Sequence, residues 1–407
     1  MSQISNYLLN QKERVVELQK KLVSIPALGP DNQGRGEKQK ADFLLSYLAD
    51  AGFTEIIEVN SPDSRVPGGY RPNIIARIPG KDTGRTLWIL THLDIVPAGD
   101  RSLWQSDPFS LRVEDDLIHG RGVEDNHQGM VSSILAASAF VDIGIKPDIN
   151  LGLILVADEE TGNRHGLPYV LDAREDLFGQ DDFYLVPDIG SSDSKLLEIA
   201  EKSMLWLKVS VKGRQCHASR PDKAINSLVA ASAFVLKVRE LNDIFPKTSS
   251  LFKPSESTFT PTRKEANVPN INTIPGLDVF YIDCRVLPDY DLDDVFTQIK
   301  AIGSEIEAEY RVKVEYETVL REQSAPFMDP SSEVVARLSQ AIENVLGISP
   351  VPQGVGGGTV AVFLRRKGLN AVVWSTLLGT AHQPNECSSI KNTINDARVM
   401  AYMACPW

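Results

Sequence analysis

Hydrophobic and polar residues are arranged in two different patterns along this chain. In the N-terminal half, amphipathic stretches at helical spacing alternate with short apolar runs, and each run ends in a polar loop. Residues 5–25 and 36–51 predict amphipathic helices, and Pro26 ends the first. Apolar strands are predicted at 54–59, 73–78, 86–90, 150–156 and 183–186, with an apolar helix at 130–140. This order favours an α/β fold with helices packed on both faces of a largely parallel mixed sheet.

A second pattern begins near Ser203. Residues 204–213 alternate apolar and polar with period two, which is typical of a strand covered on one face. The elements that follow are a helix at 222–241, a polar segment at 247–269, a strand at 277–288, a helix at 292–310 and a strand at 311–320. We therefore expect an inserted α+β domain at 205–320. The first pattern returns afterwards, so the larger domain is expected at 1–204 and 321–407.

The composition of the chain argues against some classes of binding partner and favours one cellular compartment. The chain carries 54 acidic and 42 basic side chains, a net charge of −12, which argues against nucleic acid or an anionic membrane as partner. Its four cysteines have no paired spacing, so a reducing compartment fits best. No apolar run approaches the roughly 20 residues of a membrane span, and no secretory signal pattern is present. We expect a cytoplasmic protein.

Histidines and carboxylates gather in the loops that follow the predicted strands. His92 and Asp94 end one strand, and being two apart they share a face of it. Asp125, Asp188 and His382 also lie in such loops, as does the acidic run 158–160. Parallel strands present their carboxyl ends at one edge of a sheet, so these side chains converge there. Any one of them alone is more typical of a solvated loop, but together they predict a metal site.

Five segments resemble a known family: THLDIV, GRGVED, ADEETG, PD and AHQPNE, in this order. They are similar to the di-zinc exopeptidases and deacylases that include acetylornithine deacetylase, succinyl-diaminopimelate desuccinylase, aminoacylase and glutamate carboxypeptidase. GRQCHAS, NTIPG and IDCR extend the resemblance over the inserted domain. The resemblance implies a zinc-exopeptidase-like fold, with the insertion acting as a lid and as the contact of a homodimer.

The same resemblance assigns roles to single residues. It implies that His92 and Asp188 bind one zinc ion, that Glu160 and His382 bind a second, and that Asp125 bridges both. Cobalt or manganese would be substitutes, whereas Mg²⁺ prefers a shell of oxygen ligands. Asp94 is expected to accept the free ring N–H of His92. Glu159 would be the general base, and His217 from the lid would help hold the oxyanion.

Substrate contacts are implied for Asn272, Arg285 and the run 356–359, which contains Gly357, Gly358 and Thr359. Arg285 suits a carboxylate but could equally pair with Asp283, and Lys202 is a weaker candidate. The chain departs from the family where His127 replaces a common lysine and Val360 a common aspartate. His119 and His165 are assigned no role.

The expected reaction is hydrolysis of an amide in a small N-acyl amino acid or short peptide. One alternative is an exopeptidase, aminopeptidase-like or carboxypeptidase-like. Another is a zinc-binding module without turnover, against which Glu159 argues, because a pure binder needs no base. A serine or cysteine hydrolase has little support: there is no Gly-x-Ser-x-Gly elbow, and Cys216 beside His217 lacks a separated partner.

Overall fold

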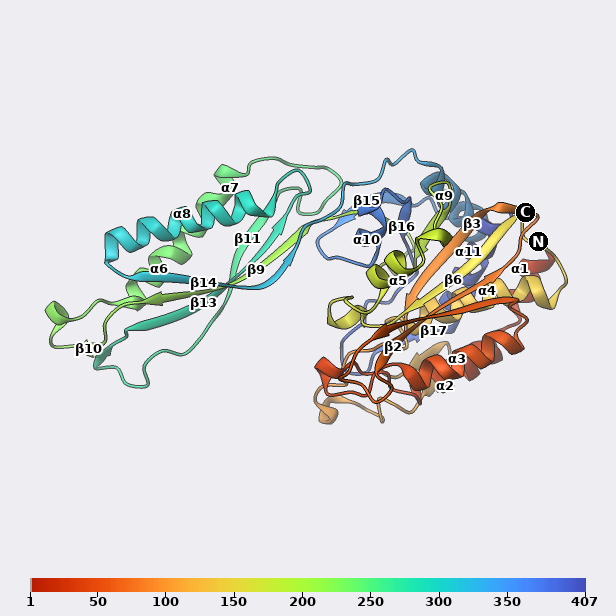
Figure 1. Cartoon of the computed structure of the whole chain (residues 1–407), viewed down its shortest axis with the longest axis horizontal. Helices are drawn as coiled ribbons and strands as arrows, with labels where there is room; N and C mark the ends of the chain where they lie inside the picture. Colours follow the sequence, from red (N-terminus) through yellow and green to blue (C-terminus); the bar gives the residue numbers. More distant parts are fainter. Residues whose placement is uncertain (1) are drawn as a thin grey trace. The chain divides into compact units, whose positions relative to one another are not determined.

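The computed structural model describes residues 2–407, which form two compact units (Figure 1). The larger unit comprises the chain up to Ile199, Met328–Pro352 and Thr359–Trp407. The smaller unit comprises Ala200–Phe327 and Gln353–Gly358. The junctions expected from the sequence, 204/205 and 320/321, lie close to these positions, but residues 353–358 also group with the smaller unit.

The larger unit is built on an eight-stranded mixed sheet with the order β1-β2-β6-β3-β7-β16-β8-β15. Its four central strands run parallel, β2 is antiparallel to β1 and β6, and β8 is antiparallel to β16. The strands are β1 (Glu55–Pro62), β2 (Tyr70–Ile78), β3 (Asp82–His92), β6 (Ile149–Val156), β7 (Phe183–Val186), β8 (Leu196–Glu201), β15 (Val351–Val355) and β16 (Ala371–Val373). A small sheet joins β4 (Arg112–Glu114), β5 (Leu117–His119) and β17 (Cys387–Ser389). The expected α/β class is confirmed.

Helices cover both faces of the large sheet. They are α1 (Gln3–Leu9), α2 (Lys12–Val23), α3 (Lys38–Asp50), α4 (His127–Asp142), α5 (Leu167–Ala173), α9 (Glu333–Leu346), α10 (Ala361–Arg366) and α11 (Ile390–Ala404). Helices α5 and α10 pack with Trp88 and Leu90 of β3, whereas α4 and α11 pack together on the opposite face. The helix predicted at 5–25 is two helices because the chain turns at Asn10. No helix among residues 2–407 is long and apolar enough to span a membrane.

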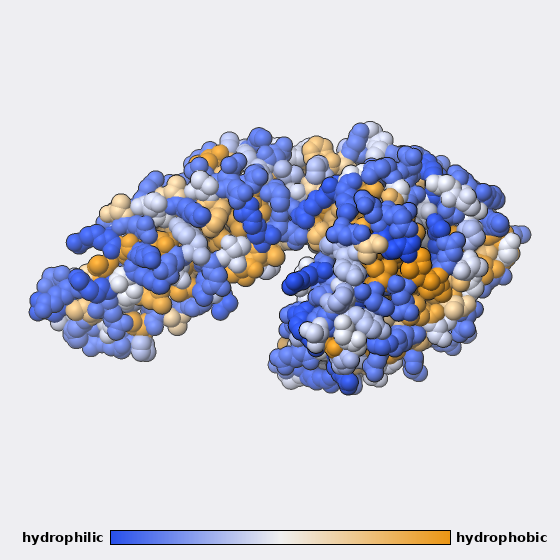
Figure 2. Space-filling view, in the orientation of Figure 1, coloured by the Kyte–Doolittle hydropathy of each residue, from blue (hydrophilic) through white to orange (hydrophobic). Residues whose placement is uncertain are grey.

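The smaller unit has an antiparallel four-stranded sheet with the order β11-β13-β9-β14. Its elements are β9 (Ser203–Lys212), β10 (Cys216–His217), α6 (Ser227–Lys237), α7 (Leu241–Ile244), β11 (Thr258–Lys264), β12 (Thr273–Ile274), β13 (Leu277–Val286), α8 (Leu292–Tyr310) and β14 (Lys313–Glu322). Apolar residues of α6 and α8 pack on one face of this sheet, around Phe234 and Phe280. The polar segment 247–269, for which no element was predicted, contains the edge strand β11. Hydrophilic side chains dominate the visible surface of each unit (Figure 2).

Candidate metal centre

Three neighbouring parallel strands bring their carboxyl ends to one edge of the large sheet. Strand β3 ends at His92, β6 leads into the short 3-10 turn Glu159–Thr161, and β7 is followed by Asp188. Because β3 pairs with both β6 and β7 in parallel, these three ends meet at the same edge. Asp125 precedes α4, and His382 lies between β16 and β17. The sequence pattern predicted this convergence.

The structure gathers all five predicted ligands into two groups that share Asp125. In the first group, His92 Nε2 is 2.8 Å from Asp125 Oδ1 and 3.6 Å from Asp188 Oδ1. In the second group, His382 Nε2 is 3.0 Å from Asp125 Oδ2 and 3.2 Å from Glu160 Oε2. Each oxygen of Asp125 therefore faces a different imidazole, which is the arrangement a bridging carboxylate needs.

The pKa shifts of the histidines and carboxylates in these two groups indicate whether the site favours divalent cations. Burial of the His92 ring opposes its charge, but hydrogen bonds to Asp125 and Asp188 outweigh burial and hold its pKa well above the usual value. Hydrogen bonds to Asp125 and Glu160 raise the pKa of His382 to about 10. Burial, with the charge of Asp125, raises the pKa of Glu160 to about 7. The carboxylates thus attract positive charge, and the nitrogen and carboxylate donors fit zinc.

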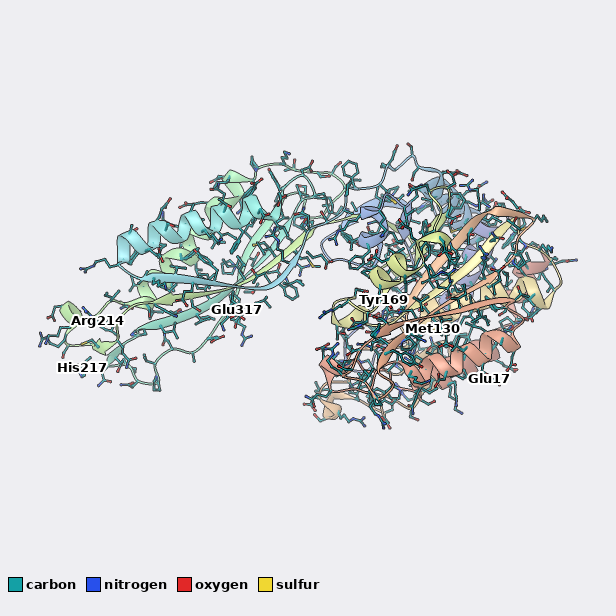
Figure 3. The ribbon with its side chains drawn as sticks, viewed as in Figure 1. Glu17, Met130, Tyr169, Arg214, His217 and Glu317 are labelled. Atoms are coloured by element: carbon teal, nitrogen blue, oxygen red, sulfur yellow. The ribbon has the colours of Figure 1, made fainter. Side chains whose placement is uncertain are left out.

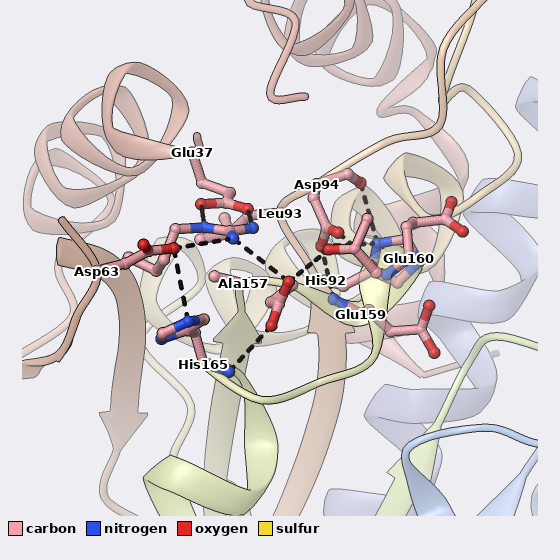
Figure 4. Close-up of polar contacts among 12 residues, drawn as sticks. Glu37, Asp63, His92, Leu93, Asp94, Ala157, Glu159, Glu160 and His165 are labelled. Atoms are coloured by element: carbon pink, nitrogen blue, oxygen red, sulfur yellow. Dashed lines mark hydrogen bonds and ion pairs between the residues drawn. The ribbon is translucent and has the colours of Figure 1, made fainter. Parts of the chain in front are cut away.

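Glu159 lies beside both groups but belongs to neither. Its backbone N–H donates to Asp94 Oδ1 at 3.1 Å (Figure 4), and its carboxylate has no hydrogen-bond partner within residues 2–407. Burial and the charge of Asp188 raise the pKa of this carboxyl well above its usual range. A carboxylate that binds protons readily and is not held by a partner has the properties of a general base.

Asp94 differs from its predicted role. His92 Nδ1 lies 3.0 Å from the backbone carbonyl of Asp94, whereas the Asp94 carboxylate is 3.6 Å from that nitrogen. The carboxylate instead accepts the backbone N–H groups of Glu159 and Glu160, at 3.1 and 3.0 Å. The expectation that the side chain of Asp94 fixes the His92 ring was therefore wrong, because the ring nitrogen lies within hydrogen-bond distance of the backbone carbonyl and not of the carboxylate. Asp94 therefore holds the backbone of the turn that carries Glu159 and Glu160.

A buried ionic layer supports this edge of the sheet (Figure 4). Arg71, fully buried, pairs with Glu37 and lies 3.3 Å from Asp158. Lys40 is also buried and donates to the carbonyl of Leu93 at 2.8 Å. Lys40 was missed in the sequence, although it precedes the inward-facing Leu44 by one turn of α3.

His127 takes no part in either ligand group. It is buried, and its Nε2 lies 2.8 Å from Nζ of Lys40. Burial and the neighbouring Lys40 charge lower its pKa well below the usual value. Where the family commonly has a lysine at position 127, this chain has a histidine that contacts a buried lysine from α3.

Two buried glutamates tie the ligand loops to each other. Glu124, next to Asp125, accepts hydrogen bonds from the backbone N–H groups of Leu378, Gly379 and Thr380, which precede His382. Glu386, beyond His382, accepts from the N–H groups of Gly122, Glu124 and Asp125 at 2.9 to 3.1 Å. Each loop therefore contributes the acceptor that holds the other. Sequence reasoning missed both, though each stands in a motif that carries a ligand.

The remaining predicted residues lie in or near the smaller unit. His217 is exposed near its tip (Figure 3) and pairs across β10 and β12 with Thr273, while Ala218 N donates to the carbonyl of Asn272 at 2.8 Å. His217 and Asn272 are therefore neighbours. An added Cβ at Gly357 would meet nothing within 4 Å, and one at Gly358 would meet Met204 at 3.1 Å.

Thr359 and Val360 begin the chain's return to the larger unit. Thr359 is buried, and its hydroxyl accepts the N–H of Ala361 at 3.1 Å. Val360 packs in the core beside α5 and α10. The family departure at Val360 therefore adds an apolar core contact.

Two basic candidates already have partners. The guanidinium of Arg285 forms two hydrogen bonds with Asp283, at 2.7 and 3.0 Å, and a third with the Gly356 carbonyl at 2.8 Å. The ion pair that the sequence left open is thus present. Lys202 is buried and donates to the carbonyls of Pro254 and Glu256.

Comparisons with known proteins agree with this architecture. Residues 88–405 match peptidase family M20/M25/M40. An uncharacterised metallohydrolase of Methanococcus maripaludis is 41% identical over 95% of this chain and 97% of its own length. A succinyl-diaminopimelate desuccinylase of a Nitratiruptor species is 27% identical over 92% of this chain and 94% of its own. The fold is shared with the dipeptidase Dug1p of Saccharomyces cerevisiae, at TM-score 0.75 and 18% identity, covering 99% of this chain and 98% of that one. The resemblance is confirmed, and the chain is a metallohydrolase of peptidase family M20/M25/M40.

Proposed function

We propose that this protein hydrolyses an amide bond in a small N-acyl amino acid or short peptide at a di-zinc centre. The observation that carries the proposal is the Glu159 carboxylate, which has no hydrogen-bond partner among residues 2–407 and lies beside two ligand groups that share Asp125. His92 and Asp188 would hold one ion, Glu160 and His382 the other, and Asp125 both. When bound, the ions would polarise the amide carbonyl and make water more acidic.

The chain's own residues would move the protons. Glu159 takes a proton from the attacking water as the new carbon–oxygen bond forms. It then gives that proton to the departing nitrogen as the carbon–nitrogen bond breaks, so the products are a carboxylic acid and an amine. Asp94 keeps Glu159 in place through the backbone of its turn.

The smaller unit would act as a lid. We assign His217 to the oxyanion of the tetrahedral intermediate and Asn272 to the acyl group, since the two lie side by side. Arg285 would reach a substrate carboxylate only by exchanging its contact with Asp283. Helix α6 exposes Leu228, Val229 and Leu236, which supports a homodimer formed through this unit.

An acyl amide is favoured over a peptide by one observation. The related Nitratiruptor protein is named a desuccinylase, and it aligns with nearly the whole chain. The test is turnover of N-acetyl, N-succinyl and N-formyl amino acids and dipeptides by the zinc-loaded protein. Glu159→Ala, with its zinc content checked, is the matched control. We expect at least one substrate to be cleaved and the variant to keep zinc but lose the rate. Zinc binding without turnover of any substrate would favour the binding-module alternative.

A further inference from the structure

A groove separate from the candidate metal centre lies on the larger unit. Its volume is about 640 Å³. It is bordered by the end of α1, the C-terminal end of α9, one side of α11 and the loop after β7. None of the five proposed ligands is among the described residues that line it. The groove therefore needs its own explanation.

Three cationic side chains line this groove: Lys12, Lys391 and Arg398. None of them has a carboxylate within 4.0 Å among residues 2–407, although cations elsewhere on this acidic chain commonly do, as Arg85 does with Glu333. Arg398 is half-buried and donates only to neutral oxygens, of Ser5 and Asn395, at 3.0 and 2.9 Å. Partial burial lowers its pKa, as expected for a cation without a counter-charge.

The two acidic residues that line the groove, Asp116 and Asp193, accept hydrogen bonds from other groups. The Asp116 carboxylate accepts the Ser389 hydroxyl at 2.5 Å and the Lys391 backbone N–H at 3.0 Å. The Asp193 carboxylate accepts the Ser191 hydroxyl at 2.7 Å and lies 3.5 Å from Lys195. Neither carboxylate lies within 4.0 Å of the charged group of Lys12, Lys391 or Arg398 among residues 2–407. With three cations and two carboxylates the lining carries a net charge of +1, on a protein whose net charge is −12.

The remaining lining residues are six aliphatic and five neutral polar ones. Ile390 and Ile394 of α11 are buried, and Leu9 remains 43% exposed. Val345 and Leu346, at the end of α9, add two partly buried side chains. An inorganic ion alone would leave this apolar surface in contact with water, so the lining fits a ligand with an aliphatic part.

We propose that this groove binds a small oxyanion that carries an aliphatic group. Lys12, Lys391 and Arg398 would hold the anionic group, and the side chains of Ile394, Leu9 and Leu346 would cover the aliphatic part. Carboxylates and phosphates share this chemistry. The site does not depend on the proposed hydrolysis, because no residue of the metal centre lines it.

The test is calorimetric titration of the zinc-loaded protein with hexanoate and, separately, with hexyl phosphate. Hexanamide and inorganic phosphate are the controls that lack the charge and the alkyl chain. We expect one of the two amphipathic anions to bind at one site per chain, at least about tenfold more tightly than either control. Whichever anion binds identifies the head group.

Three variants locate the binding. Arg398→Gln and Lys391→Gln each remove one unpaired cation, and each should weaken binding about tenfold or more, which is typical of a lost charge-assisted hydrogen bond. Lys20→Gln removes an exposed charge of α2 that does not line the groove, and it should change nothing. Lys391 is exposed and its side chain makes no contact within residues 2–407 that the fold needs, so its variant tests the site even where Arg398→Gln fails to fold.

Two results would overturn the proposal. The first is no binding of either amphipathic anion, or equal binding of the controls. The second is binding that persists in Lys391→Gln and disappears when zinc is removed, because the anion would then lie at the metal centre.

Discussion

The two halves of the candidate metal centre are built in different ways. His92 ends strand β3 and Asp188 follows the adjacent parallel strand β7, and their side chains are only 2% and 12% exposed. His382 lies on a loop between short strands, and its side chain is 54% exposed. The register of the sheet fixes His92 and Asp188, whereas in the second half hydrogen bonds from the loop to Glu124 hold His382.

This difference has a consequence for metal binding. A site whose ligands are already ordered loses less conformational entropy when it binds an ion than a site that must order a loop. We therefore expect the His92–Asp125–Asp188 position to bind zinc more tightly than the Asp125–Glu160–His382 position. Variants of single residues should therefore affect zinc affinity at the two positions differently, and should affect turnover separately from zinc binding.

The largest expected effect is on turnover, not on binding. Glu159 belongs to neither half, so Glu159→Ala should retain both ions while kcat falls by about 10²- to 10⁴-fold, the usual contribution of a general base. Steady-state kinetics and metal analysis of the same sample check this. A variant that keeps its rate, or that loses an ion, would contradict the assignment of Glu159.

The next largest effect is on zinc retention, and it distinguishes the two halves of the centre directly. After zinc loading and desalting, His382→Ala should keep one ion per chain, because the strand-held position remains intact. His92→Ala should keep almost none, because only the weaker, loop-held position is left. Metal content by mass spectrometry distinguishes the two. If the retention is reversed, the loop-held position is the tighter one.

A smaller effect is expected from the two loop glutamates. Glu124→Gln loosens only the loop before His382, so zinc affinity at the second position should fall about tenfold while the first position is unchanged. Glu386→Gln loosens the backbone of Asp125, the shared ligand, so both positions should weaken. Competition with a chelator measures both steps. Equal effects of the two variants would show that the loops do not act separately.

The smallest effect concerns the metal-free protein and pH. The pKa of His382 rises from 6.5 in an unperturbed ring to about 10, through hydrogen bonds to Asp125 and Glu160. The folded chain then binds this proton more tightly than the unfolded chain, so the contribution to stability is complete below about pH 6.5 and is lost as pH approaches 10. The melting temperature of the metal-free protein should fall over this window, and less steeply in His382→Ala. An identical slope in both proteins would remove His382 as the cause.

Much of the fold and the candidate site was predictable because both follow from local patterns. Apolar strands that end in His92, the 158–160 run and Asp188 must meet at one edge once the strands are parallel. The order of the motifs identified the family. The antiparallel strands on the two sides of the sheet, β1 and β2 on one and β8 on the other, were not predicted, since strand direction depends on pairing between distant segments.

The supporting contacts were beyond the reach of the sequence for a similar reason. Glu124 and Glu386 meet loops more than 250 residues away, and nothing in their local sequence specifies those partners. From the sequence alone Lys40 is expected to be a surface lysine, and only the packing of α3 places it beside His127. Asp94 could accept from His92 or from the turn at Glu159, and only the structure decides between them.

The most direct test of the account is a calorimetric zinc titration of the metal-free wild-type protein beside Asp125→Ala. The account predicts two ions per chain in the wild type, one tight and one weaker, and the loss of both steps in the variant, because Asp125 is the ligand that the two positions share. A wild type that binds no zinc, or two binding steps that survive in Asp125→Ala, would contradict the di-zinc centre.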